Sequence, residues 1–428
     1  MNSTTSPFGI RDFRYYWIAR IATTLAQTSM VVIIGYQVYD IARGTLGMSL
    51  REAAFQLGLI GVAQFLPLAL LTLVVGWVAD RIDRRWVARS ALALECGCAV
   101  ALAWLTASGT ISLPWLFAIA ALLGVARAFA SPALSALAPN LVPKEILPNA
   151  IALSSIAWQG GSVVGPAIGG YLYATGHDVP YIASAGLFGV AFLCLMMIRP
   201  VPRPEMSKSP PWIQMLDGLR YVRRNKLVLG AISLDLFAVL LGGATAMLPV
   251  YARDLLHAGP EGLGHLRAAP ALGAALTALY FAFRPLKNNV GVKMLIAVVV
   301  FGAATVVFGL SRWMPLSLVA LGVLGSADML SVYVRQSLMQ LYTPDAMRGR
   351  VGAVSTLFIS GSNELGEAES GFLAALIGPV VAVVGGGIAA IVVTLLWVRL
   401  FPQLRNARTF DPPSETALAN AVLQEKPA

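Results

Sequence analysis

Apolar residues recur along this sequence in long runs that short polar segments separate. Twelve runs reach about 18 residues or more, and a helix of that length, at ~1.5 Å per residue, can cross ~30 Å of hydrocarbon. They lie near residues 17–41, 55–78, 87–107, 113–137, 148–174, 180–199, 227–252, 262–283, 293–311, 315–341, 351–375 and 378–401. The pattern predicts an all-α integral membrane protein with twelve transmembrane helices.

Composition also favours a membrane protein. Hydrophobic residues make up 57% of the 428 residues and charged residues only 12%, whereas soluble domains usually carry about 25% charged residues. The first residues, MNSTTSPFGIRDFRYYW, lack the short apolar core and small-residue cleavage site of a signal peptide. We therefore expect the first span to remain in the mature protein.

The formal net charge of +10 raises the question of nucleic-acid binding, and the positions of the basic residues argue against it. Of the 31 lysines and arginines, 23 fall in the N-terminal tail, the even-to-odd loops or the C-terminal tail, and three lie within spans. This distribution is the positive-inside pattern, so we expect both termini in the cytoplasm and no nucleic-acid partner. Five lie at the opposite face: Arg43, Arg51, Arg253, Arg267 and Arg312.

Neither the cysteines nor the histidines have the spacing of metal ligands. The cysteines lie in apolar spans and the histidines in or beside outward loops. No Gly-x-x-x-x-Gly-Lys-Ser/Thr motif for ATP is present in the sequence. We therefore expect no metal, no cofactor and no nucleophilic triad. The residues concerned are Cys96, Cys98, Cys194, His177, His257 and His265.

One long polar insertion, residues 199–226, divides the chain into halves. We expect six-helix bundles at 1–198 and 227–401, a cytoplasmic linker between them and a disordered cytoplasmic tail at 402–428. Within the linker, Trp212, Met215, Leu216 and Leu219 recur at helical spacing. They predict an amphipathic helix on the membrane surface, for which a linker role is favoured over binding of lipid headgroups.

The two halves carry an internal repeat at an offset of 201 residues. Small residues match without a gap around the fifth and eleventh spans. This predicts two pseudo-symmetric six-helix halves, related by an axis along the membrane normal, with a site at their interface. The matched pairs are Pro143 and Pro344, Gly160 and Gly361, Gly165 and Gly366, Gly170 and Gly371, Leu172 and Leu373, and Ala174 and Ala375.

Three carboxylates, Glu364, Glu367 and Glu369, interrupt the eleventh span. A charge at membrane depth costs at least ~2.5–3.5 kcal/mol, so such residues are functional candidates. Glu364 and Glu367 share one face of a helix. They form either a proton or cationic-substrate site or a structural network with Arg335 or Arg127. For proton coupling we consider Glu367 or Glu364 first, and Asp235 after them.

Other polar residues within the spans could line a substrate cavity. Arginines there would suit an anionic or catecholate substrate, and acids would suit a cation or a proton. Asp40 and Asp254 end their helices near the outer face, where capping or gating is expected. The cavity candidates are Arg20, Gln27, Arg127, Trp158, Asp328, Arg335 and Asn363.

Residues 76–90, GWVADRIDRRWVARS, form a charged loop between the second and third spans. Such a network can lock one conformation and break in another, and the alternative is a cluster that only sets topology. The loop resembles the Gly-x-x-x-Asp-Arg-x-Gly-Arg-Arg/Lys motif of the major facilitator superfamily, with Asp83 in place of the second glycine. The residues that match it are Gly76, Asp80, Arg81, Arg84 and Arg85.

Residues 161–170, GSVVGPAIGG, are similar to the helix-five signature of exporters in that superfamily. Small residues there allow close helix packing, and the proline bends the helix. The matching residues are Gly161, Gly165, Pro166, Gly169 and Gly170.

Longer segments resemble the branch that contains the enterobactin exporter and macrolide-type efflux proteins. They are FRYYWIAR, VYDIARG, NLVPKEILPNAIALSS, YTPDAMRGRVGAVSTLFISGSNELGEAESG and LLWVRLFPQLR. The resemblance implies a twelve-helix inner-membrane exporter of siderophores or lipophilic drugs. It also implies that helices one, four, seven and ten line the cavity, so Glu95 on helix three ranks below the other candidates.

We therefore expect a monomeric secondary transporter, not an enzyme. Alternating access would move a small molecule, with protons as the coupling ion and membrane lipid as the surroundings. A siderophore-type substrate is favoured over a multidrug or macrolide-type substrate. A lipid flippase and a non-transporting membrane sensor are the remaining alternatives.

Overall fold

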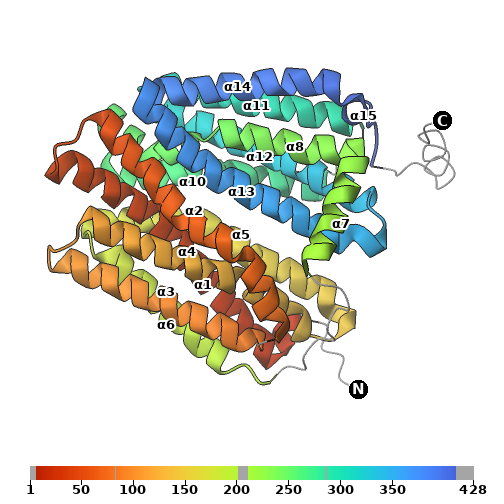
Figure 1. Cartoon of the computed structure of the whole chain (residues 1–428), viewed down its shortest axis with the longest axis horizontal. Helices are drawn as coiled ribbons and strands as arrows, with labels where there is room; N and C mark the ends of the chain where they lie inside the picture. Colours follow the sequence, from red (N-terminus) through yellow and green to blue (C-terminus); the bar gives the residue numbers. More distant parts are fainter. Residues whose placement is uncertain (1–5, 82, 201–210, 285, 287, 411–428) are drawn as a thin grey trace.

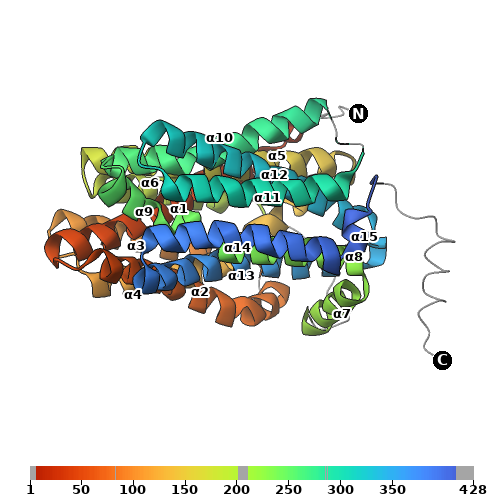
Figure 2. The same cartoon turned by 90° about the horizontal axis from the view of Figure 1, so that it is seen from above.

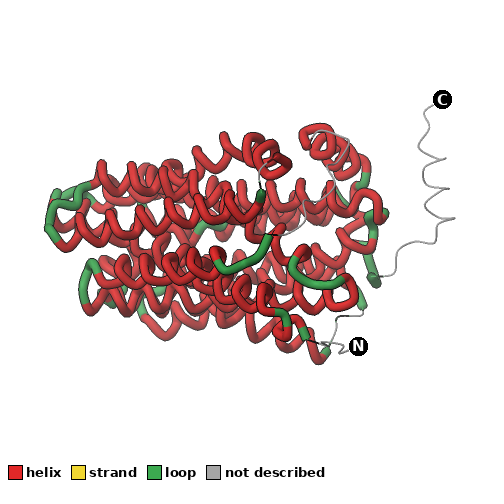
Figure 3. The backbone as a smooth tube through the Cα atoms, turned by 90° about the horizontal axis from the view of Figure 1, so that it is seen from below, coloured by secondary structure: helices red, strands yellow, loops and turns green. Residues whose placement is uncertain are grey.

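The computed structural model describes residues 6–81, 83–200, 211–284, 286 and 288–410. This part of the chain consists of helices and loops, without a strand. The long helices run along the longest axis of the molecule (Figures 1 and 2), and most loops lie at the two ends (Figure 3). Helix α7 marks one end, called here the α7 end, and the opposite end is called the far end.

The first group of helices, α1 to α6, contains the N-terminal part of the chain. Helix α1 packs against α5 and α6, α3 against α4 and α6, and α2 against α4. The elements are η1 (Pro7–Gly9), α1 (Arg11–Asp40), η2 (Ile41–Thr45), α2 (Leu50–Arg81), α3 (Arg84–Ala107), α4 (Leu113–Leu137), η3 (Ala138–Asn140), η4 (Lys144–Ile146), α5 (Leu147–Thr175) and α6 (Val179–Met196).

The second group, α8 to α15, repeats this kind of packing. Helix α10 packs against α12, α11 against α12 and α14, and α8 against α13 and α14. The elements are α8 (Lys226–Leu241), η5 (Ala244–Met247), α9 (Leu248–Val250), η6 (Tyr251–Leu255), α10 (Gly259–Phe283), α11 (Val290–Leu310), α12 (Met314–Leu341), α13 (Asp345–Ile377), α14 (Pro379–Leu400) and α15 (Pro402–Arg405).

Two helix crossings join the groups, α2 with α13 and α5 with α10 (Figure 1). At each crossing two glycines meet. A Cβ on Gly170 would lie 2.7 Å from the Gly264 Cα, and one on Gly371 would lie 2.3 Å from the Gly58 Cα. Gly170 and Gly371 are partners in the sequence repeat, so equivalent glycines form the two crossings.

Nine helical segments in the described part of the chain are long and apolar enough to cross a membrane. They are α1 with η2, α2, α3, α4, α6, α8 through η6, α11, α12 and α14. Helices α5, α10 and α13 are 29, 25 and 33 residues long but richer in glycine, proline and polar residues. The structure thus shows a multi-pass helical protein, and the number of twelve spans stays a prediction.

The seventh predicted span, 227–252, is not one continuous helix. Helix α8 ends at Leu241, and Gly242 and Gly243 separate it from η5. Neighbouring helices come very close here, since a Cβ on Gly243 would lie 2.1 Å from the Ser370 Oγ and one on Gly242 would lie 2.7 Å from the Phe301 ring. The glycine pair allows this approach and interrupts the helix.

The amphipathic helix predicted in the linker is α7 (Pro211–Arg224), which packs against α13. The Tyr221 hydroxyl donates to the Tyr342 carbonyl at 2.7 Å, and Arg350 pairs with Asp217 at 3.2 Å. Leu216, expected on the apolar face, is exposed. Residues 201–210 lie outside the described part.

The tail from residue 402 is packed in its first part, contrary to the expected disorder. Leu404 is fully buried against α8 and α11. The Gly291 amide donates to the Ala407 carbonyl at 3.0 Å. Apolar side chains and backbone bonds therefore order residues 402–410, and residues 411–428 lie outside the described part.

Candidate functional site

A pocket of about 260 Å³ lies within the second group, where the interruption after α8 meets α10, α12 and α13. We call it the acidic pocket because Asp328 and Glu367 both line it. Asn363, Thr245 and the glycines of the interruption add polar atoms to its wall. Three residues singled out in the sequence, Asp328, Asn363 and Glu367, are thus brought together.

Asp235 lies beside this pocket but is already paired. Its carboxylate forms an ion pair with Arg335 of α12, and the two side chains are only 6% and 3% exposed. Since the pair is buried, each charge compensates the other. Asp235 was predicted as a coupling residue and Arg335 as a cavity residue. In the structure their ion pair joins α8 to α12.

The carboxylates of α13 do not share one environment. Glu367 lines the acidic pocket, and it interacts electrostatically with Arg267 of α10. The Glu369 Oε2 is buried and has no hydrogen-bond partner among the described residues. The side chain of Glu364 lies outside the described part. Arg267, expected at the opposite face, lies in the first half of α10 and is half-buried.

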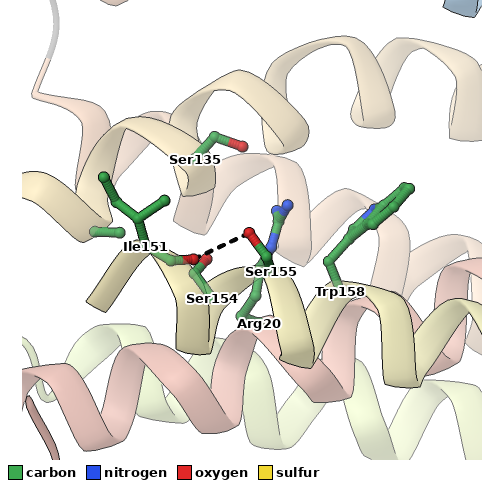
Figure 4. Close-up of a pocket in the computed structure, with 7 residues that line it drawn as sticks. Arg20, Ser135, Ile151, Ser154, Ser155 and Trp158 are labelled. Atoms are coloured by element: carbon green, nitrogen blue, oxygen red, sulfur yellow. Dashed lines mark hydrogen bonds between the residues drawn. The ribbon is translucent and has the colours of Figure 1, made fainter. Parts of the chain in front are cut away.

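A second pocket, of about 390 Å³, lies in the first group between α1, α4 and α5. Arg20, Ser135, Ser154, Ser155 and Trp158 line it, and we call it the basic pocket. Figure 4 shows the Arg20 side chain rising from α1 beside α5, with the Trp158 ring to one side. The predicted cavity residues Arg20 and Trp158 thus share one pocket.

Two more predicted cavity residues, Gln27 and Arg127, belong to buried contacts in the first group. The Gln27 Nε2 donates to Glu95 Oε1 at 2.6 Å, and Arg127 donates to Gln64 at 3.4 Å. Glu95 is fully buried, and its Oε2 has no hydrogen-bond partner within the described residues. The low rank of Glu95 in the sequence analysis gave no sign of this burial.

Reciprocal ion pairs connect the groups at the far end, and we call them the far-end pairs. Arg43 of η2 contacts Asp254 of η6 at 3.0 Å, and Arg253 of η6 contacts Asp40 of α1. The Tyr39 hydroxyl also donates to Asp254. The sequence marked Asp40 and Asp254 as capping or gating residues but did not supply their arginine partners.

In the loop between α2 and α3, Asp83 binds both the backbone and the side chain of Arg85. Its carboxylate caps α3 by accepting from the Arg85 backbone N–H at 2.9 Å, and it pairs with the Arg85 side chain at 2.6 Å. The Arg85 hydrogen bonds lower the pKa of the Asp83 carboxyl, although partial burial opposes them. Arg85 also donates to the Ile198 carbonyl, which ties α3 to the end of α6.

Other residues of the predicted switch motif are only partly visible. Gly76, Asp80 and Arg81 belong to α2 by their backbone, but the surroundings of Gly76 and the side chains of Asp80 and Arg81 lie outside the described part. The Arg84 Nε is buried without a hydrogen-bond partner among the described residues, while other atoms of Arg84 do interact. The structure therefore brings together Asp83 and Arg85 of this loop.

The glycines of residues 161–170 form two contact edges on α5. A Cβ on Gly161 would lie 2.7 Å from the Thr24 Cβ, and one on Gly165 only 2.1 Å from the Thr28 Oγ1. Gly169 meets Ser29 in the same way, and Gly170 faces α10. Pro166 lies within the helix between these contacts. Helix α5 thus touches α1 of its own group and α10 of the other.

Comparison with known proteins identifies the family. The family of transmembrane secretion effectors matches residues 2–426. The enterobactin exporter EntS of Shigella boydii serotype 18 is 29% identical over 412 residues, which cover 95% of each chain. EntS of Escherichia coli has the same identity and coverage.

Solved structures show the same fold at lower identity. The nucleoside transporter NupG aligns with a TM-score of 0.69 at 13% identity, over 91% of this chain and 100% of that chain. A bacterial homologue of the human lysosomal transporter Spinster aligns with a TM-score of 0.68 at 16% identity, over 92% and 97%. The chain therefore belongs to the transmembrane secretion effectors of the major facilitator superfamily and is a multi-pass protein of the bacterial inner membrane.

Proposed function

We propose that the protein is a secondary active exporter, not an enzyme, and that it moves a small molecule out of the cytoplasm by alternating access. The observation that supports this most directly is the closure of one end. Charge pairs and glycine crossings join the two groups at and near the far end, while each group holds a polar pocket. The Spinster homologue that aligns with this chain is in an inward-facing conformation.

The proposed topology has twelve transmembrane helices in two six-helix bundles. We assign residues 1–198 and 227–401 to the bundles, with the linker and both termini in the cytoplasm. Helix packing supports the division, because each group packs mainly within itself and meets the other mainly through α2, α5, α10 and α13. The α7 end is then cytoplasmic, and the far-end pairs close the outer side of a monomer.

For coupling we propose protons that bind at Glu367, with Asp328 as its neighbour in the acidic pocket. A proton shifts the exchange between two conformations only if it binds them with different affinity. Glu367 fits this role because it lines a cavity and lies near Arg267. Asp235 fits less well because Arg335 already pairs with it, and Glu364 stays a candidate from its position on α13.

A siderophore is the proposed substrate class, since the curated relatives are enterobactin exporters. A multidrug or macrolide-type substrate is the second candidate. The carboxylates of the acidic pocket favour it, because a lipophilic cation would be attracted there. Both candidates use the same exchange between inward-facing and outward-facing conformations.

The proposal is tested in iron-starved bacteria that lack their own siderophore and drug exporters. They express the wild type, Glu367→Gln or the matched control Glu261→Gln at equal membrane levels, and siderophore in the medium is quantified. Glu261 is an exposed acid at the start of α10. We expect secretion by the wild type and the control, and its loss in Glu367→Gln.

Other outcomes separate the parts of the proposal. No secretion by the wild type, together with efflux of lipophilic drugs, would replace the siderophore by the second candidate. Secretion by all three proteins would show that Glu367 does not bind the coupling proton. Absence of transport for every compound tested would contradict the exporter assignment itself.

A further inference from the structure

The three arginines expected to line the cavity differ in how their charge is compensated. Arg335 pairs with Asp235, and Arg127 donates to Gln64. Arg20 is half-buried in the basic pocket, and no carboxylate in the described part of the chain forms an ion pair with it. Its Nε is buried and has no hydrogen-bond partner among the described residues.

A half-buried cation without an ion-pair partner inside a predicted span is a functional candidate, which applies to Arg20. It is the tenth residue of a helix that starts at Arg11, within the third turn of α1. The Tyr16 hydroxyl, one turn earlier, is hydrogen-bonded to the Ser154 hydroxyl at 2.8 Å. The neighbouring side chains therefore leave the Arg20 guanidinium able to donate hydrogen bonds to a ligand in the pocket.

The walls of the basic pocket complement an anion on an aromatic scaffold. When Tyr16 donates the bond to Ser154, the Ser154 proton remains available to a ligand. Ser155 donates to the Ile151 carbonyl at 3.0 Å, and Ser135 also lines the pocket. Trp158 is 48% exposed, and its aromatic ring offers a stacking surface.

The acidic pocket has the opposite character. Asp328 and Glu367 line it, so an anionic group is repelled there whenever these carboxyls are ionised, whereas the Arg20 charge attracts it. Its volume of about 260 Å³ compares with about 390 Å³ for the basic pocket. The larger volume is within the range of small-molecule sites, about 300–1,000 Å³.

We propose that the basic pocket binds the anionic oxygen group of an aromatic ligand. A carboxylate, phenolate or phosphate accepts two N–H bonds from the Arg20 guanidinium, as this planar group allows. The Ser154 hydroxyl adds a third bond, and the aromatic ring lies on Trp158. The inference rests on the proposed export function and specifies the charge of the exported molecule and the group of helices that recognises it.

The test measures binding to the purified full-length protein in lipid nanodiscs by isothermal titration calorimetry. The probes are 2-naphthoate, 2-naphthyl phosphate and the uncharged isostere 2-naphthamide. The variants are Arg20→Gln, Arg20→Lys and Trp158→Leu. Arg14→Gln is the matched control, because it removes the same charge from an exposed position on the same helix.

We expect the wild type and Arg14→Gln to bind both anions more tightly than the amide. Arg20→Gln should weaken binding of the anions about tenfold or more, because it removes charge-assisted hydrogen bonds. It should leave binding of the amide unchanged, which also shows that the variant is folded. Arg20→Lys should recover part of the affinity, and Trp158→Leu should weaken all three probes alike.

Equal affinity of the wild type for 2-naphthoate and 2-naphthamide would overturn the inference. So would an Arg20→Gln protein that binds the anions as tightly as Arg14→Gln does. Siderophore secretion without binding of either anion would refute the inference and leave the proposed function intact. Charge-dependent binding in a protein that exports nothing would support the pocket and refute the proposed function.

Discussion

At the scale of single residues, several of the charges within the helices are held by a partner far along the sequence. Asp235 and Arg335 are 100 residues apart and pair in the interior. Gln27 and Glu95 belong to different helices and meet at 2.6 Å. The sequence showed that these residues are polar within apolar spans. It could not show their partners, because pairing depends on the rotation of each helix about its axis.

Breaking the Asp235–Arg335 pair should destabilise the protein. Asp235→Asn leaves the Arg335 charge buried without its counter-charge, and a buried pair that loses one partner typically costs about 3–5 kcal/mol. The double variant Asp235→Asn, Arg335→Gln removes both charges and should recover much of the loss. Thermal unfolding in detergent micelles measures both effects, and a double variant no more stable than the single one would contradict the explanation.

At the scale of helices, runs of apolar residues were a reliable guide to where helices form, and glycines determine how closely they pack. The glycine motif on α5 was visible in the sequence, and its contacts with Thr24 and Thr28 of α1 were not. The interruption after Leu241 and the packed tail were missed. Both depend on neighbours, Phe301 and Ser370 in one case and Gly291 in the other.

Adding a methyl group should have opposite consequences at two glycines of α5, one packed closely against α1 and one facing open space. Gly165→Ala places a Cβ 2.1 Å from the Thr28 Oγ1 and 2.7 Å from the Leu25 carbonyl, so α5 must move away from α1. Overpacking of this kind costs about 1–3 kcal/mol. Gly160→Ala is the matched control, because nothing lies within 4 Å of its added Cβ.

The same thermal unfolding assay compares the two alanine variants. Gly165→Ala should unfold at a lower temperature than the wild type, whereas Gly160→Ala should unfold at the same temperature or slightly higher. Equal behaviour of the two variants would mean that the close contact between α1 and α5 does not limit stability.

At the scale of the whole molecule, the structure joins two groups of helices by equivalent contacts. The repeat at an offset of 201 residues matched Gly170 with Gly371, and these two glycines do form the two crossings. The repeat did not reveal Gly264 and Gly58, nor the arginines that complete the far-end pairs. Such partners arise from the meeting of the two groups, which no periodic pattern within one helix encodes.

Reversing one charge of a far-end pair should open the outer side. Arg43→Asp places two acids together, because the new side chain faces Asp254. Asp254→Arg places two arginines together in the same way. In each variant, repulsion replaces attraction between the groups. The double variant Arg43→Asp, Asp254→Arg restores an opposite-charge pair and should close it again. Electron paramagnetic resonance distances between labels at Leu46 and Leu256, in a background without the native cysteines, measure the opening.

The two single variants should show a longer label distance, or a larger population of the long distance, than the wild type and the double variant. Unchanged distances in both single variants would show that the ion pairs do not hold the outer side closed and that the glycine crossings suffice.

The interruption after α8 has a mechanical consequence. The short segment beyond it, from η5 through η6, contributes Thr245 to the acidic pocket and Arg253 and Asp254 to the far-end pairs. Gly242 and Gly243 separate this segment from α8, which the Asp235–Arg335 pair joins to α12. Any tilt of the segment at these glycines would therefore move the pocket wall and the outer closure together.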